Sequence, residues 1–227
     1  MTTIGPERTA PGDVPYAAMR HAMVASQLRT NAVNDPRVVA AMSAVAREDF
    51  LPAEARAMAY RDAAIPLGAG RWANLPMATG RLLTEAYLLP GDRVLLIGAA
   101  GGYAAAVLAG LVAEVVAVEC DDALADLARN ALAGLGNVAV VQAPLAAGHA
   151  DGAPYDVLLV DGALETVPDT LVHQVRPGGR LVAGLVEHGV TRLAAGRRTE
   201  GGFALASFAD VECVILPGFA APKPFTF

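Results

Sequence analysis

The chain contains few of the residues that cross-link small proteins or hold metal ions. Its 227 residues include two cysteines, four histidines and one tryptophan. Cys120 and Cys213 lie far apart and lack the close spacing of a zinc site, and the histidines form no cluster. We therefore expect two reduced thiols and no bound metal.

Long apolar runs are also missing. Residues 97–113 are uncharged, but glycines interrupt their start and Glu114 follows them. This stretch is shorter than the roughly 20 apolar residues that a membrane span requires. Residues 1–15 include Pro, Gly, Glu and Asp and lack the apolar core of a signal peptide. These absences predict a cytoplasmic protein without a membrane partner.

Positive charge is less abundant than negative charge. The 17 Lys and Arg residues face 23 Asp and Glu residues, and the formal net charge of −6 argues against a nucleic-acid partner. Hydrophobic residues make up 54% of the chain, which is typical of a compact globular protein. We predict a flexible tail over residues 1–15 and one domain over residues 16–227. The oligomeric state stays open, a homodimer included.

Residues 94–119 predict a β-α-β unit of a nucleotide-binding sheet. An apolar run leads into a glycine loop, an alanine-rich helix follows, and a second apolar run ends at Glu119. Glycines let the backbone approach a ligand closely, and Glu119 is placed to accept hydrogen bonds from a ribose diol. A dinucleotide site would require glycine at position 100 and a small residue at position 103, where the chain has Ala100 and Tyr103. S-adenosylmethionine is therefore favoured over NAD as the ligand.

Further apolar runs predict an α/β fold with a mostly parallel, doubly wound sheet. The runs are continuous, as strands covered on both faces require. The predicted central strands are residues 94–97, 115–119, 138–142, 157–160 and 180–185, separated by helices at 103–112, 122–135 and 167–175. Weaker alternation over residues 191–199 and 203–216 predicts edge or antiparallel strands.

The residues before the sheet predict a helical cap. Helical spacing of apolar residues covers 16–28, Asp35 and Pro36 begin a second helix, and further helices are expected at 53–58 and 77–88. Residues 71–76 are expected to form a loop. The domain thus divides into a cap with a substrate loop (16–90) and a Rossmann-like sheet with C-terminal strands (91–227).

Several segments resemble the protein-L-isoaspartate O-methyltransferase family. The matching motifs lie between residues 19 and 185, at 35–38, 47–62, 66–68, 98–103 and 177–181. The segment 47–62 is the most specific of them, whereas many methyltransferases share the glycine loop. The resemblance implies a Rossmann-like methyltransferase fold with S-adenosylmethionine as donor and S-adenosylhomocysteine as product. It also implies a function in protein repair, in which a methyl group is transferred to a protein or peptide carboxylate of an isoaspartyl residue.

The resemblance and the β-α-β unit together indicate the site residues. We expect the donor to contact Gly98, Ala99, Gly101, Gly102, Tyr103, Glu119, Cys120 and Asp161. We expect the substrate near Trp72, Asn74 and Pro76, with Asn74 in the place of a family hydroxyl that aligns the reacting carboxylate. Two alternatives stay open: Asn74 could cap the helix near Met77, and Asp161 could cap a turn before Gly162.

Departures from the family pattern lie where chemistry is expected. Leu96 replaces an acid, Ala100 replaces the middle glycine, and residues 143–145 replace Gly-Asp-Gly. A carboxylate acceptor is ionised at neutral pH, so the reaction requires alignment and no general base. Each hydrogen bond that the protein no longer makes to the charged S-adenosylmethionine weakens its binding free energy by about 1.5–3 kcal/mol. A degenerate binding module without turnover and a methyltransferase redirected to another acceptor are therefore the alternative functions.

Overall fold

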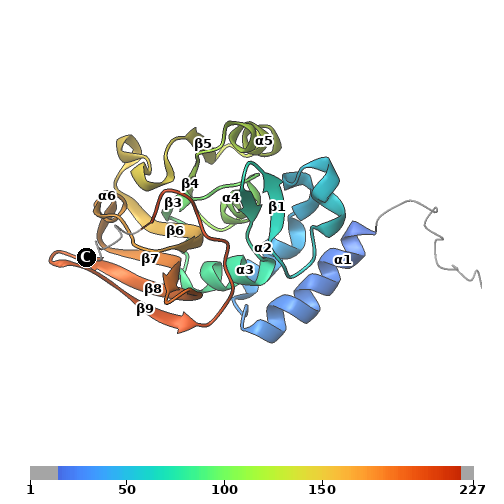
Figure 1. The fold of residues 1–227 in the computed structure, drawn as a ribbon, viewed down its shortest axis with the longest axis horizontal. Helices are drawn as coiled ribbons and strands as arrows, with labels where there is room; N and C mark the ends of the chain where they lie inside the picture. The colour runs from blue at the N-terminus through green and yellow to red at the C-terminus, as the bar shows by residue number, and fades with distance from the viewer. Residues whose placement is uncertain (1–14, 221–227) are drawn as a thin grey trace, which may run out of the picture.

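The structure is a computed structural model that describes residues 15–220. A central sheet has helices on both of its faces, and the N-terminal helices gather at one side of it (Figure 1). Apart from Pro15, the tail predicted over residues 1–15 lies outside the described residues. No helix in the described part of the chain is long and apolar enough to cross a membrane.

The main sheet has seven strands in the order β5-β4-β3-β6-β7-β8-β9. The first five strands in that order run parallel, whereas β8 pairs antiparallel with both β7 and β9, which confirms the predicted mostly parallel sheet. Their bounds are β3 (Arg93–Ile97), β4 (Glu114–Glu119), β5 (Val138–Gln142), β6 (Tyr155–Leu164), β7 (Val175–Glu187), β8 (Val190–Thr199) and β9 (Gly202–Ala209).

The strand order reverses beside β3. From β3 the chain adds β4 and β5 on one side, and it then returns to place β6 on the other side. In open parallel sheets, a ligand binds at such a point, outside the carboxyl ends of the strands. The expected crevice therefore lies at the carboxyl ends of β3 and β6.

Both faces of the sheet are covered by apolar side chains. Along β3, Val94 and Leu96 pack in one cluster, and Leu95 and Ile97 pack in the other. This alternation is the period of a strand, here with every position apolar because neither face meets water. The first cluster holds the N-terminal cap with α3 (Pro76–Glu85) and α4 (Tyr103–Ala109) and residues of α5 (Asp122–Leu132); the second holds α6 (Asp169–Val172), η5 (Leu145–Ala147) and C-terminal residues.

The predicted N-terminal helices form, with differences in detail. Helix α1 (Tyr16–Met23) continues as η1 (Val24–Leu28) and η2 (Arg29–Asn31). The Asp35 carboxylate accepts the Arg37 N–H at 2.8 Å, and Pro36 begins α2. The remaining short elements are α2 (Pro36–Ala44), η3 (Arg47–Phe50), η4 (Ala53–Met58) and η6 (Ala150–Gly152).

Three predicted boundaries were wrong. Residues 71–76 are not all loop, because β2 (Arg71–Ala73) pairs with β1 (Ile65–Gly68). The helix expected at 167–175 is only α6, since Val175 already begins β7. The strand expected at 203–216 ends at Ala209, and the chain then turns back over the carboxyl end of the sheet (Figure 1).

Candidate active site

The glycine loop lies at the point where the strand order reverses. Residues 98–102 join β3 to α4, and Gly98, Ala100 and Gly102 have φ values of 83°, 49° and 102°. These values favour glycine, so Ala100 occupies a strained position. Because a Cβ on Gly101 would lie 2.0 Å from the Phe50 carbonyl oxygen, η3 packs directly on this loop.

Glu119 ends β4 with its carboxylate fully buried and already bound by the protein. Its Oε1 accepts from Arg71 Nε (3.1 Å) and from the N–H groups of Cys120 (2.9 Å) and Asp121 (3.1 Å). Its Oε2 accepts from Arg71 Nη2 (2.8 Å) and the Ala100 N–H (2.7 Å). Burial acts to raise the pKa of Glu119, but Arg71 and the backbone donors hold it below its ordinary value. Glu119 is therefore an ionised partner of Arg71, and its predicted ribose contact stays a prediction.

The C-terminal segment, which we define as residues 211–219, lies over the same point of the sheet. The Ala163 N–H donates to the Val214 carbonyl (2.7 Å), and the Leu216 N–H donates to the Ala163 carbonyl (2.8 Å). Leu216 is buried against glycine backbone: a Cβ added at Gly98 or Gly162 would lie 2.8 or 2.7 Å from its side-chain carbons. The side chain of Leu216 thus covers the carboxyl ends of β3 and β6.

Asn74 and Asp161, which are 87 positions apart, are brought together. Asn74 Nδ2 donates to Asp161 Oδ1 (3.0 Å), while Asn74 Oδ1 accepts the Val214 N–H (3.2 Å). Thr79 Oγ1 also donates to Asp161 Oδ1 (2.7 Å). Burial raises the pKa of Asp161 against the opposing effect of these two donors. Asn74 does not cap α3, whose N-cap is Leu75. Its side-chain amide joins the residues that follow β2 to the C-terminal segment.

Arg47 is a buried cation beside Asn74. Its Nη2 donates to the Asn74 carbonyl (2.6 Å), and its guanidinium lies 4.7 Å from the Tyr103 ring centroid. No carboxylate within the described part of the chain forms an ion pair with it. Arg47 Nε and the Tyr103 hydroxyl have no hydrogen-bond partner there. Burial lowers the pKa of Arg47 and raises that of Tyr103 to about 12, so the phenol is a neutral donor.

The other predicted site residues lie around this centre. Trp72 is 45% exposed, on the opposite side of β2 from Arg71. Pro76 is buried at the first turn of α3, and Cys120 Sγ lies 3.5 Å from Glu119 Oε1. Sequence reasoning assigned no role to Arg71 or Arg47. The only signal for Arg71 was that it is the single cation of the predicted substrate loop, whereas Arg47 is one of three arginines in the family-specific stretch 47–62.

The space in front of the loop is small. A cavity of about 20 Å³ is lined by Arg47, Asn74, Tyr103, Asp161 and the loop, among other residues. It has room for about one water molecule, whereas small-molecule sites typically measure roughly 300–1,000 Å³. Neither Glu119 nor Leu216 lines this cavity, because Arg71 holds the Glu119 carboxylate and Leu216 packs on Gly98.

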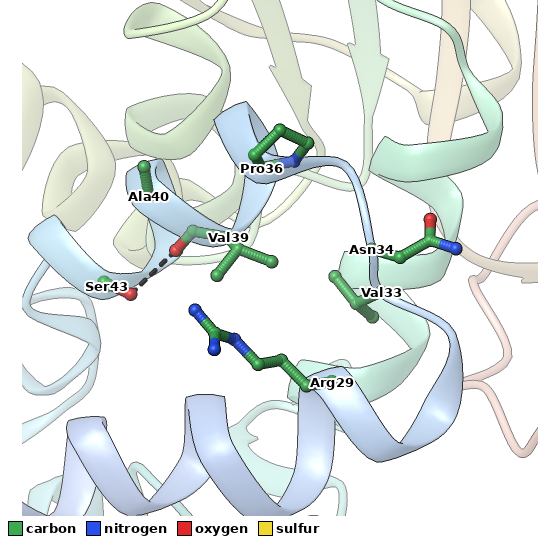
Figure 2. A pocket seen from close by; sticks show the side chains of 7 residues that line it. All are labelled: Arg29, Val33, Asn34, Pro36, Val39, Ala40 and Ser43. Atoms are coloured by element: carbon green, nitrogen blue, oxygen red, sulfur yellow. Dashed lines mark hydrogen bonds between the residues drawn. The ribbon is translucent and has the colours of Figure 1, made fainter.

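A larger hollow lies away from the loop. It measures about 460 Å³ and is lined by residues of η2, α2 and the turn between them. The guanidinium of Arg29 extends into it near Val39 and Ser43 (Figure 2). No residue of the glycine loop lines this hollow, and no group of three or more His, Cys, Asp or Glu residues suited to a metal occurs in residues 15–220. The predicted site residues therefore lie apart from this hollow, near the carboxyl ends of β3 and β6.

Known proteins are similar to this chain over most of its length. The profile of the protein-L-isoaspartate(D-aspartate) O-methyltransferase family matches residues 19–217. Protein-L-isoaspartate O-methyltransferase 1 of Rhodopseudomonas palustris strain HaA2 is 45% identical over 169 residues, which are 74% of this chain and 69% of that protein. Protein-L-isoaspartate O-methyltransferase of Methylorubrum extorquens strain PA1 is 39% identical over 228 residues, covering 96% of this chain and 99% of the relative.

Solved structures share the fold. A protein-L-isoaspartate O-methyltransferase superposes with a TM-score of 0.75 at 22% identity, covering 88% of this chain and 66% of that one. The corresponding protein of Plasmodium falciparum, in complex with S-adenosyl-L-homocysteine, gives a TM-score of 0.71 at 16% identity, covering 90% and 99%. With the profile match and the sequence identities, these similarities confirm the predicted family and Rossmann-like fold. The chain belongs to the protein-L-isoaspartate(D-aspartate) O-methyltransferase family, whose members are S-adenosylmethionine-dependent enzymes that act on isoaspartyl-containing proteins.

Proposed function

We propose that this chain methylates the carboxylate of an isoaspartyl residue in a protein or peptide, and that Arg47 binds this carboxylate. The observation that carries the proposal is the unpaired charge of Arg47, which is 2% exposed. Its guanidinium lies beside Asn74, where the resemblance places the reacting carboxylate. A buried charge without a partner is costly, so the pocket favours an anion.

The free donors of the pocket suit a carboxylate oxygen. Arg47 Nε and the neutral Tyr103 hydroxyl both lack partners among the described residues, and both residues line the small cavity. A charge-assisted hydrogen bond from Arg47 would be stronger than the contact with the water molecule for which the cavity has room. The carboxylate is already ionised, so the role of the protein is to fix its position and exclude water.

The Asn74 amide supports this division of roles. Asn74 Nδ2 donates to Asp161 Oδ1 and to Cys213 Sγ (4.0 Å), and Asn74 Oδ1 accepts the Val214 N–H. The predicted contact of the Asn74 NH2 group with substrate would therefore displace one of its two acceptors. In this structure, the backbone carbonyl oxygen of Asn74 accepts a hydrogen bond from Arg47 and orients its guanidinium. The role in substrate binding predicted for Asn74 stays a prediction.

The setting of the reaction is also part of the proposal. We infer that the protein acts in the cytoplasm on protein or peptide substrates, with neither nucleic acid nor membrane as partner. Two free thiols, Cys120 and Cys213, and a net charge of −6 support this.

Replacing Arg47 tests the proposal. With an isoaspartyl peptide at saturating donor, Arg47→Gln should raise KM about tenfold or more, because a hydrogen bond to a charged group is lost. Arg47→Lys should recover part of the loss, since it keeps the charge. Arg29→Gln, in the hollow of Figure 2, is the control and should leave KM unchanged.

Calorimetry with S-adenosylhomocysteine separates the acceptor role from a donor role. A change in its Kd with an unchanged peptide KM would show that Arg47 binds the donor carboxylate and would overturn the proposal. Donor binding by the parent protein without methylation of the peptide would indicate another acceptor. A thermal melt of each variant verifies that it folds.

A further inference from the structure

We propose that this chain holds its donor site closed with two of its own side chains. Arg71 donates to both oxygens of the Glu119 carboxylate, and Leu216 covers Gly98. The donor therefore binds only after both side chains have moved. The inference goes beyond the family assignment and concerns donor binding alone. It therefore holds or fails independently of the acceptor.

Arg71 competes directly with a ribose for Glu119. A carboxylate offers about four lone-pair sites, and Glu119 already accepts six hydrogen bonds, two from Arg71, three from backbone N–H groups and one from Cys120 Sγ. No acceptor position is left for a ribose diol. Both side chains of the pair are buried, at 5% and 0% exposure, so water does not screen the attraction. A ribose can bind Glu119 only if the Arg71 guanidinium leaves.

Leu216 blocks the second half of the site. Its side-chain carbons lie against the backbone of Gly98, after β3, and of Gly162, within β6. These two strands flank the point at which the strand order reverses, where ligands of open parallel sheets bind. The carboxyl ends that a nucleoside would contact are thus covered by a leucine side chain.

The C-terminal segment lies outside the paired strands of the sheet. Near Leu216 its backbone bonds to β6 are the two at Ala163, and the Val214 N–H donates to Asn74 Oδ1. At its start, the Cys213 N–H donates to Thr191 Oγ1 (3.0 Å), which anchors it to β8. The segment also buries Cys213, Val214, Leu216 and Phe219, so it opens only when these apolar contacts are lost together with its few backbone bonds.

Asn74 links the two closing parts. It follows β2, which carries Arg71, and its side chain accepts the N–H of Val214 in the C-terminal segment. Movement of β2 away from Glu119 therefore strains the bond that holds the C-terminal segment in place. Opening at one part should favour opening at the other, and weakening either should raise the fraction of molecules that can bind donor.

Titration calorimetry with S-adenosylhomocysteine tests the closed site. Arg71→Met removes the competitor of the ribose, and Leu216→Ala uncovers Gly98. Each should tighten binding about tenfold relative to the parent, because apparent affinity scales with the binding-competent fraction. Arg93→Met, which breaks the half-exposed pair with Glu114, and Leu205→Ala on β9 are matched controls and should bind as the parent does.

The two variants change different parts of the closed site, so one folded variant is sufficient for the test. Arg71→Met leaves Glu119 without its cation and could unfold; Leu216→Ala then decides, with a thermal melt verifying its fold. Folded variants that bind no more tightly than the parent would overturn the proposal, as would the absence of binding by every protein. Peptide methylation is not part of this readout, so a wrong acceptor does not affect it.

Discussion

Gly101 joins the family-specific segment to the nucleotide loop. A Cβ at this position would lie 2.0 Å from the Phe50 carbonyl oxygen and 3.2 Å from Leu127 Cδ2. The Phe50 ring meets that of Tyr103 edge to face, with centroids 6.1 Å apart. The loop therefore takes its shape from η3 as well as from its own glycines.

We predict that Gly101→Ala destabilises the protein by about 1–3 kcal/mol or more, because backbone must shift to admit the methyl group. Gly134→Ala is the control: its Cβ would meet nothing within 4 Å, and its φ is not positive. That change should alter the free energy of unfolding by less than about 0.5 kcal/mol. Urea unfolding followed by circular dichroism measures both, and equal losses would contradict the packing described.

At Glu119, sequence reasoning located the residue but not its partner. A continuous apolar run ending in an acid places a carboxylate at the end of a parallel strand, and the structure confirms that position. Its cation, Arg71, is 48 positions earlier, on a three-residue strand that no periodicity could reveal. Arg47 was missed for a related reason, because its lack of an ion pair is visible only in three dimensions.

At the scale of the elements, a buried ion pair ties β7 to the turn before β3. Arg180 Nη2 lies 2.6 Å from Asp92 Oδ1, and the exposures of these side chains are 8% and 4%. Asp92 Oδ2 also accepts the Leu89 N–H at 2.7 Å, and Arg180 reaches the carbonyl oxygens of Ala86 and Tyr87. The pair thus connects the end of the helical cap with the middle of the sheet.

We predict that Arg180→Met lowers the free energy of unfolding by about 3–5 kcal/mol, because Asp92 is left buried without its cation. Arg176→Met is the matched control, since Arg176 pairs with Asp156 at the surface and such pairs contribute about 0–1 kcal/mol. Chemical denaturation gives both values. If the loss is chiefly an unpaired buried charge, Arg180→Met combined with Asp92→Leu should recover part of it; a double variant no better than the single one would refute this explanation.

The elements differed in how far the sequence predicted them. The central strands were predicted from continuous apolar runs, because every side chain of a strand is buried when both faces of the sheet are covered. Residues 211–216 belong to the weaker alternation that begins at residue 203, which predicts that they continue the last strand. They instead leave the sheet after Ala209 and bury Val214 and Leu216 across its carboxyl end. Composition shows that such a segment is buried, but not which surface it covers.

At the scale of the whole molecule, two distant parts of the chain meet over the carboxyl ends of β3 and β6. Strand β2, which carries Arg71, comes from the N-terminal part of the chain, and Leu216 comes from the end of the described residues. Both lie where the strand order reverses, and Asn74 connects them. The division into a cap over residues 16–90 and a sheet over 91–227 stays a prediction. The two parts share one apolar cluster, which supports the predicted single domain.

A crystal structure of the protein with S-adenosylhomocysteine tests the closed donor site most directly. We expect the ribose hydroxyls on the Glu119 carboxylate, the Arg71 guanidinium withdrawn beyond hydrogen-bond distance of it, and Leu216 displaced from Gly98. The strands of the central sheet should superpose on those described here. A ligand bound at the glycine loop while Arg71 still holds Glu119 and Leu216 still covers Gly98 would contradict the proposal.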